Sequence, residues 1–301
     1  MTQANAIADA VQDAAAVPPW MTGAVLAIVL ALVVFGGLNR IAAVTEKLIP
    51  ALSVLYTLGG IAVIVLHTDQ VPRMLSEIFR QAFTVSAAVG GAAGTGIRAA
   101  MRYGFSRGIF SNEAGLGSSG MVYAAAEDAK PVEQGMWGIF EVFADTIVVC
   151  TVTAFAILSS GAAAQAKTGA ALTVAAFETV LGQTGSLFIS VSIVLFALAS
   201  MLGWAYYGER GFCRFAGENG AVLYRFVFVA AAVAGCTAKL ELVWNLSEIF
   251  NGLMALPNLY AILLLTPVVV EETNRWFAKR SRGRKTKKCR LNQRMKEYFC
   301  E

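Results

Sequence analysis

The stretch SAAVGGAAGTGIRAAMRYGFSRGIFSNEAGLGSS, residues 86–119, decides how this chain is organised. It lies between long apolar segments and carries four glycines within seven residues: Gly90, Gly91, Gly94 and Gly96. Each glycine costs a helix about 1 kcal/mol relative to alanine, so this density predicts a helix that unwinds and restarts. Inside a membrane, unwound backbone is tolerated only where protein buries it or where it lines a wet cavity. The freed N–H groups suit an anion such as a carboxylate, and the freed carbonyls suit a cation such as Na⁺.

The composition is that of an integral membrane protein. The 301 residues are 57% hydrophobic and 15% charged, whereas soluble domains carry about 25% charged residues. The mean hydropathy is +0.62. The five cysteines show no CxxC or metal-ligand spacing, so we interpret them as reduced and structural. The first twenty residues have no basic segment before an apolar stretch and do not read as a signal peptide.

Seven apolar segments, each about 20 residues long, are expected to cross the bilayer, which makes the fold class all-α. They are 21–38, 48–66, 74–103 with its break at Gly90–Gly96, 136–158, 185–207, 221–236 and 242–268. Loops are expected at 39–47, 67–73, 104–135 and 159–183, the last with a short helix around 173–180. Pro257 and Pro267 leave the last segment as one kinked helix or two shorter pieces.

Three regions follow from this pattern. Residues 1–20 form a polar, Ala-rich lead, expected as a loop or surface helix. Residues 21–270 form the membrane domain, and residues 271–301 form a basic tail. Eleven of the 24 Lys and Arg residues lie from Arg275 onward, although the net charge of the chain is only +4. Such a tail is typical of contact with anionic lipid, and no aromatic or fold signal supports a nucleic-acid partner.

The basic residues also predict the orientation, because cytoplasmic loops are richer in Lys and Arg. With the tail inside, the inside loops hold Arg40, Lys47, Arg107, Lys130, Arg210 and Arg214. The outside loops then hold only Arg73, Lys167 and Lys239. We therefore expect a multi-pass protein of the plasma membrane with a cytoplasmic C-terminus and an N-terminus outside.

Several runs in this sequence resemble the sodium:alanine symporter (amino acid:cation symporter) family. RGIFSNEAGLGSS at 107–119 is the most specific of them. The others are GGLNRIA at 36–42, QAFTVSAAVGGAAG at 81–94, DTIVVCTVTAFAIL at 145–158, LFALASMLGWAYYGE at 195–209 and VWNLSEIFNGLMALPNLYAILLL at 243–265. The resemblance covers about residues 20–270 in collinear order.

The resemblance implies a leucine-transporter-type fold of two inverted five-helix repeats, here partial. The seven segments would correspond to core helices four to ten, which places the N-terminus outside, as the charge count does. The implied activity is Na⁺-coupled symport of alanine or another small neutral amino acid by alternating access. Core helices one to three have no counterpart, so the chain is expected to be an N-terminally truncated member. The alternative is a non-transporting membrane fragment that needs its missing N-terminal helices.

Two other classes of function are weaker alternatives. A membrane enzyme is disfavoured because one loop histidine, His67, and scattered cysteines offer no nucleophile–base pair. A cation channel is a further alternative, because a pore could also use glycine-rich breaks in its helices.

The resemblance assigns the substrate site to Gly90, Gly91, Ala92 and Gly94 on the unwound helix, with Trp204 walling its apolar end. The family often has an aromatic residue where Ala92 stands, so the size of the substrate is open. The competing interpretation of the glycines is close helix packing through small residues, which membrane helices use freely.

The resemblance also assigns sodium ligands and coupling groups. The hydroxyl of Ser200 and the carbonyl of Ala197 would bind Na⁺, a hard cation that prefers oxygen. The alternative for Ser200 is a serine that bonds back to its own helix. Asp145 is the candidate coupling residue, because an acid inside a membrane span is costly and functional by default. Asn112 and Glu113 are expected as cap and gate groups near the inner mouth, with Ser111 or Asn112 capping a helix that starts at Glu113.

Overall fold

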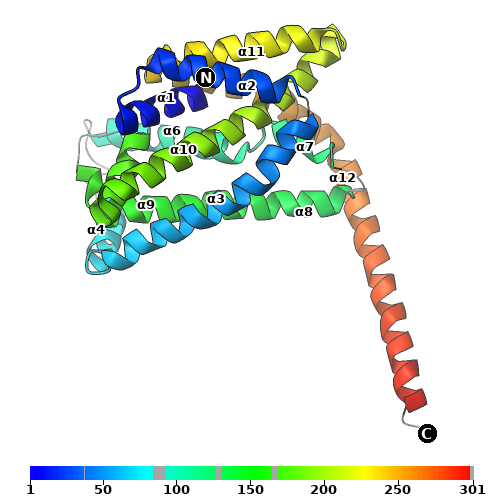
Figure 1. Cartoon of the computed structure of the whole chain (residues 1–301). Coiled ribbons are helices and arrows are strands. Elements are labelled where there is room, and N and C mark those ends of the chain that lie inside the picture. The colour runs from blue at the N-terminus through cyan, green and yellow to red at the C-terminus, as the bar shows by residue number, and fades with distance from the viewer. Residues whose placement is uncertain (37, 84–92, 127–129, 165–168, 299–301) are drawn as a thin grey trace. The chain divides into compact units, whose positions relative to one another are not determined.

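The structure is a computed structural model of the 301-residue chain (Figure 1). It describes residues 1–36, 38–83, 93–126, 130–164 and 169–298. Side chains are described for these residues except 38–45, 48, 81–83, 93–97, 99, 100 and 281–298. Within the described residues every regular element is a helix, which agrees with the expected all-α class.

The helices follow one another with few long connections. In chain order they are α1 (Thr2–Ala15), α2 (Pro19–Val34), α3 (Leu38–Leu66), α4 (Val71–Phe83), α6 (Ala93–Asn112), α7 (Ser118–Tyr123), α8 (Pro131–Val142), the π-helix η1 (Phe143–Val149), α9 (Cys150–Ser159), the 3₁₀ turn η2 (Ala162–Ala164), α10 (Ala170–Ala216), α11 (Gly220–Thr237) and α12 (Leu240–Tyr298). They belong to two compact units. The first unit contains Met1–Asn112 and Val142–Asn251, and the second contains Glu113–Glu141 and Gly252–Glu301.

Five described helical segments are long and apolar enough to cross a membrane. They are Ile49–Leu66, Pro131–Ser159, Ala170–Ala216, Gly220–Thr237 and Leu240–Arg280. Helix α2 is also apolar but has only 16 residues, and the expected segment 74–103 is divided between α4 and α6. The long helices keep their backbone hydrogen bonds within themselves, as the hydrocarbon interior requires. The chain therefore fits a multi-pass membrane protein.

The polar lead differs from the loop or surface helix expected for residues 1–20. Residues 2–15 form α1, which contacts α10 and α11 in the first unit (Figure 1). Ala4 and Ala8 are fully buried, and such small side chains let helices approach closely. The amide Nδ2 of Asn5 donates to the carbonyls of Gly235 (3.1 Å) and Ala238 (2.9 Å), which lie at the end of α11. Asn5 thus satisfies carbonyls that a helix end leaves without partners.

The first unit contains two apolar clusters. One joins α1 and α2 to the second half of α10 and to α11, around Leu30 and Leu202. The other joins α3 and α9 to the first half of α10, around Val63 and Phe177. The short helix expected around 173–180 is confirmed, and its residues 174–177 are buried in the second cluster instead of lying in an exposed loop.

Several helix boundaries differ from the expected ones. Helix α3 begins at Leu38, so the expected loop at 39–47 is helical and Pro50 lies inside the helix. The run from Leu38 to Ile49 contains no glycine or proline, so nothing in it breaks the helix. Helix α12 is one continuous helix across Pro257 and Pro267, and not two pieces.

The expected helix break at Gly90–Gly96 is wrong at its C-terminal end. Helix α6 begins at Ala93, so Gly94 and Gly96 are helical. A helix tolerates isolated glycines at about 1 kcal/mol each when its hydrogen bonds continue. Gly90 and Gly91 lie outside the described residues.

A glycine turn divides α10 into two helices. Gly182 has φ 55° and ψ −143°, a conformation that L-residues with a side chain rarely adopt. Three residues later, a Cβ built on Gly185 would lie 2.6 Å from the carbonyl oxygen of Phe177. This close approach of two backbones requires glycine at 185, because a carbonyl cannot move aside as a side chain can.

Replacing Gly185 with alanine is therefore expected to destabilise the chain by about 1–3 kcal/mol through overpacking. The matched control is Gly203→Ala on the same helix, where no atom lies within 4 Å of the added Cβ. There the alanine is expected to be neutral or to stabilise by up to about 1 kcal/mol. Unfolding in detergent, followed by the loss of helical circular dichroism on addition of SDS, measures both. Equal stability of the two variants would contradict the close approach.

Candidate functional site

The expected substrate residues lie mostly beyond the described part of the chain. Gly90, Gly91 and Ala92 fall in residues 84–92, outside the described residues. Gly94 is the second residue of α6, at a position where the structure does not describe the side chains. What the structure provides is the helix that follows these residues, α6, and its partners.

The expected sodium ligands Ala197 and Ser200 share one face of α10 with Trp204, the expected wall of the substrate site. Ala197, Ser200 and Trp204 are spaced three and four apart, which places them on neighbouring turns of one helix face. Ala197 is 4% exposed within the cluster of α1, α2 and α11. Ser200 and Trp204 are half-buried, and the ring of Trp204 packs edge-on against Tyr207 at 5.5 Å. Within the described residues, no hydrogen bond or ion pair joins this face to Asp145.

Asp145 lies in the π-helix η1, a feature that the sequence pattern did not reveal. Its Oδ2 accepts a hydrogen bond of 2.5 Å from the hydroxyl of Ser111 at the end of α6. The neighbouring Thr146 has a buried Oγ1 without a hydrogen-bond partner among the described residues. A π-helix inside an α-helix widens one turn and is frequent at functional sites. The expected coupling residue is therefore held at an irregular turn and tied to α6.

A second polar cluster on α6 was missed by the sequence analysis. The carboxylate of Glu248 on α12 accepts hydrogen bonds from Ser106 Oγ and Arg107 Nη1, both at 3.1 Å, and from Arg102 Nη2 at 3.3 Å. The signal was available, because SEIF places this acid within the apolar run 242–268. An acid in such a run needs a partner, and the two arginines of α6 supply it.

The loop after α6 is shaped by glycines and by Asn258. Gly115 and Gly117 have φ of 74° and 83°, values that favour glycine. The amide Nδ2 of Asn258 on α12 donates to the carbonyl of Gly115 at 3.0 Å. A Cβ at Gly117 would lie 2.6 Å from Asn258 Oδ1. The GLG part of SNEAGLGSS is thus required by a backbone turn packed against one asparagine.

Asn112 and Glu113 do not start a helix, which corrects the expected cap. Asn112 is the last residue of α6, and Glu113 follows it in the left-handed conformation with φ 52°. The carboxylate Oε2 of Glu113 instead accepts hydrogen bonds from the hydroxyls of Ser118 (2.5 Å) and Ser119 (3.2 Å). These serines begin the short helix α7, so Glu113 ties the loop to the helix that follows it.

Two acids and a tyrosine meet in the second unit. The hydroxyl of Tyr123 donates to Glu141 Oε2 at 2.7 Å. Burial raises the pKa of the Glu113 carboxyl, the serine hydrogen bonds oppose that rise, and the nearby charge of Glu141 adds to it. Burial and the hydrogen bond to Glu141 likewise raise the pKa of Tyr123. Glu113 is thus an acid whose protonated form the fold favours.

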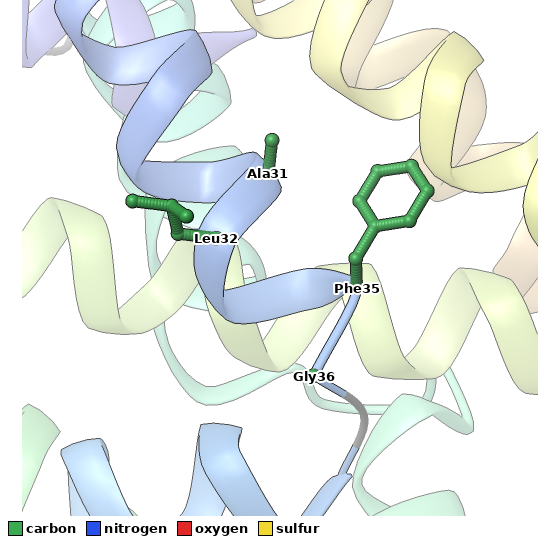
Figure 2. A pocket seen from close by; sticks show the side chains of 4 residues that line it. All are labelled: Ala31, Leu32, Phe35 and Gly36. Carbon is green, nitrogen blue, oxygen red and sulfur yellow. The ribbon is translucent and has the colours of Figure 1, made fainter.

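A shallow hollow of about 430 Å³ lies at the end of α2 (Figure 2). Its lining residues are Ala31, Leu32, Phe35 and Gly36, and in Figure 2 the side chain of Phe35 projects from the end of α2. None of these four side chains carries a charge or a hydrogen-bonding group. An amino acid needs partners for its carboxylate and its ammonium, so this hollow does not fit one.

The described residues contain no group of three or more His, Cys, Asp or Glu side chains that could hold a metal ion.

Comparison with known proteins identifies a family. The model of the sodium:alanine symporter family matches residues 1–290. A sodium/alanine symporter of Methanococcus maripaludis is 42% identical over 277 residues, which are 91% of this chain and 60% of that protein. An uncharacterised transporter of Haemophilus influenzae is 38% identical over 277 residues, 91% of this chain and 61% of that protein. A probable sodium/glutamine symporter of Bacillus subtilis is 40% identical over 270 residues, 89% of this chain and 55% of that protein. The chain spans about 60% of the length of these curated relatives.

The raised pKa of Glu113 predicts a pH dependence of stability. An acid with a raised folded pKa binds its proton more tightly when folded, so stability falls as the pH rises from the ordinary value of 4.5 through the folded pKa. Glu113→Gln keeps an oxygen for Ser118 and Ser119 and removes the charge. We expect this variant to have a higher melting temperature than the parent at pH 7. Its melting temperature should also decrease less than that of the parent between pH 4.5 and 7.5. A parent whose stability rises over this range in comparison with the variant would contradict the prediction.

Proposed function

Because this chain belongs to the sodium:alanine symporter family, we propose that it carries out sodium-coupled symport of alanine or another small neutral amino acid. Members of the family are transporters and not enzymes. The single observation that carries the proposal is the match of the family model over residues 1–290. The five apolar helices long enough to cross a membrane support a multi-pass carrier.

Two points of the function stay open within this proposal. One relative is named as a sodium/alanine symporter and another as a probable sodium/glutamine symporter, so alanine and glutamine are both candidate substrates. The chain also spans only about 60% of the length of these relatives. The alternative is therefore a membrane fragment that transports only together with further helices.

The proposed mechanism is alternating access in a leucine-transporter-type fold. Helix α4 ends at Phe83 and α6 begins at Ala93, with the Gly90–Gly91 pair between them. The N–H groups of Gly90, Gly91, Ala92 and Gly94 would bind the substrate carboxylate, because helix starts attract anions. The ring of Trp204 would cover the apolar side of the substrate.

The co-transported sodium ion is proposed to bind α10. The hydroxyl of Ser200 and the carbonyl of Ala197 supply two oxygens from neighbouring turns of one face. Asp145 is the proposed coupling residue, since its carboxylate lies at the irregular turn η1 and is bonded to Ser111 on α6. Asn112 and Glu113, at the junction that follows α6, are proposed as gating residues.

The proposed location is the plasma membrane, with the C-terminus in the cytoplasm. The support is the charge of the last segment, where eleven Lys and Arg residues follow from Arg275 onward. Anionic lipid is the proposed partner of this basic end, at roughly 1 kcal/mol of attraction per basic residue close to the surface.

Uptake into proteoliposomes tests the function. We expect labelled alanine, glutamine or both to accumulate when an inward Na⁺ gradient is present and not when K⁺ replaces it. The 301-residue chain is compared with the same chain joined to the part of the Methanococcus relative that lies outside the alignment. Uptake by the joined protein alone would favour the fragment alternative. Uptake that does not saturate or concentrate would favour a channel, and no sodium-driven uptake by either protein would reject the proposal.

Ser200→Ala tests the sodium ligand in whichever protein transports. Losing an ion–oxygen contact of about 1.5 kcal/mol is expected to raise the Na⁺ concentration for half-maximal uptake roughly tenfold. The matched control is Ser192→Ala on the same helix, whose hydroxyl already bonds back to the carbonyl of Phe188 at 2.8 Å. The control is expected to leave the sodium dependence unchanged. An unchanged sodium dependence in Ser200→Ala would remove Ser200 from the site.

A further inference from the structure

The strongest feature outside the assigned residues is the contact of α6 with Glu248. One carboxylate on α12 receives hydrogen bonds from three side chains on α6, at 3.1, 3.1 and 3.3 Å. The Glu248 side chain is 21% exposed, that of Arg107 33% and that of Arg102 68%. Arg107 is therefore the shielded partner, and Arg102 is the solvated one that adds little.

Aromatic side chains extend the same contact by one turn of each helix. The guanidinium of Arg107 lies 3.4 Å from the ring centre of Trp244, four residues before Glu248 on α12. The ring of Phe110 packs edge-on against Trp244 at 5.2 Å. Arg107 thus sits between a carboxylate and an indole face, both on α12, so its position relative to that helix is set from two sides.

This cluster is placed to transmit movement. Helix α6 follows, in the chain, the glycine-rich segment that is proposed to hold the substrate, and the cluster occupies residues 102–110, from the middle of the helix to near its end. All the members lie within the first unit. A partly buried carboxylate is costly unless it is neutralised, so separating α6 from α12 would leave both charges without partners.

We propose that Glu248 is a positioning residue that fastens α6 to α12, so that these two helices move as one body in the transport cycle. This inference rests on the proposed transport function. It assigns Glu248 no contact with the substrate or with sodium, and predicts that its loss slows the cycle while leaving substrate binding in place.

The first test separates turnover from affinity. Glu248→Gln keeps the shape and an oxygen for Ser106 but removes the charge that holds the arginines. We expect kcat for sodium-driven uptake to fall roughly tenfold, while KM for the amino acid stays within about twofold, as for an interaction absent from the ground-state binding step. The matched control is Glu241→Gln, an exposed acid on the same helix, which is expected to change neither. A tenfold rise in KM with kcat intact would place Glu248 in the binding site and overturn the proposal.

A crosslink tests whether the contact stays closed. In a background with all five cysteines replaced by alanine, Ser106→Cys and Glu248→Cys are combined and joined by a short bifunctional thiol reagent. We expect the double variant to transport slowly. The crosslink should restore at least half of the parent rate, because a covalent link between α6 and α12 replaces the ionic one. Loss of the residual transport on crosslinking would show that α6 and α12 must separate, and would overturn the proposal.

A third measurement needs no transport. Arg107→Gln, Glu248→Gln and the double variant form a thermodynamic cycle read from melting temperatures in detergent. Each single variant is expected to melt about 3 °C lower, and the double variant no lower than the worse single variant. Additive shifts in melting temperature would mean that the two side chains do not act together, and would reject the proposed role of Glu248. This readout is independent of uptake. A parent that fails to transport would therefore reject the proposed function, while the thermodynamic cycle would still test the link between Arg107 and Glu248.

Discussion

The hydrocarbon interior accepts no unpaired backbone group, and most of this structure follows from that constraint. The apolar segments are helical because a helix pairs backbone N–H and C=O groups within a single segment. Places where the helices are irregular therefore stand out. The π-helix η1, the glycine turn at Gly182 and the start of α6 at Ala93 are such places. Two of the three adjoin residues with a proposed role in transport.

Three charged side chains within the spans also have partners on another helix. Glu248 forms ion pairs with two arginines of α6, and Asp145 accepts a hydrogen bond from a serine hydroxyl of α6. Glu209 on α10 forms a bidentate pair with Arg225 on α11, both bonds being 2.7 Å. Each of these contacts joins two different helices. These polar groups thus form specific links between helices whose other contacts are apolar and less specific.

Glycines contribute to the fold in a different way, by allowing close approaches to the backbone. Gly185 allows the two halves of α10 to meet backbone to backbone, and Gly117 allows Asn258 to approach the loop after α6. In both places a methyl group would meet a polar atom at 2.6 Å. The run SNEAGLGSS is therefore a structural motif, with Glu113 linking the loop to α7.

The all-α class and the family were predictable from the amino-acid sequence, because the length of an apolar run and the residues of a motif are local properties of the chain. The sequence also predicted the helical segment at 173–180, whereas the coupling role of Asp145 stays a prediction. Tertiary structure alone decided that the polar lead packs as α1, since the burial of Ala4 and Ala8 depends on α10 and α11. It likewise decided that Glu248 meets Arg102 and Arg107, which lie about 140 positions away in the chain. Local patterns do not specify such pairings, because a charged side chain in an apolar run signals only that it needs a partner, and only the packing of helices selects which one.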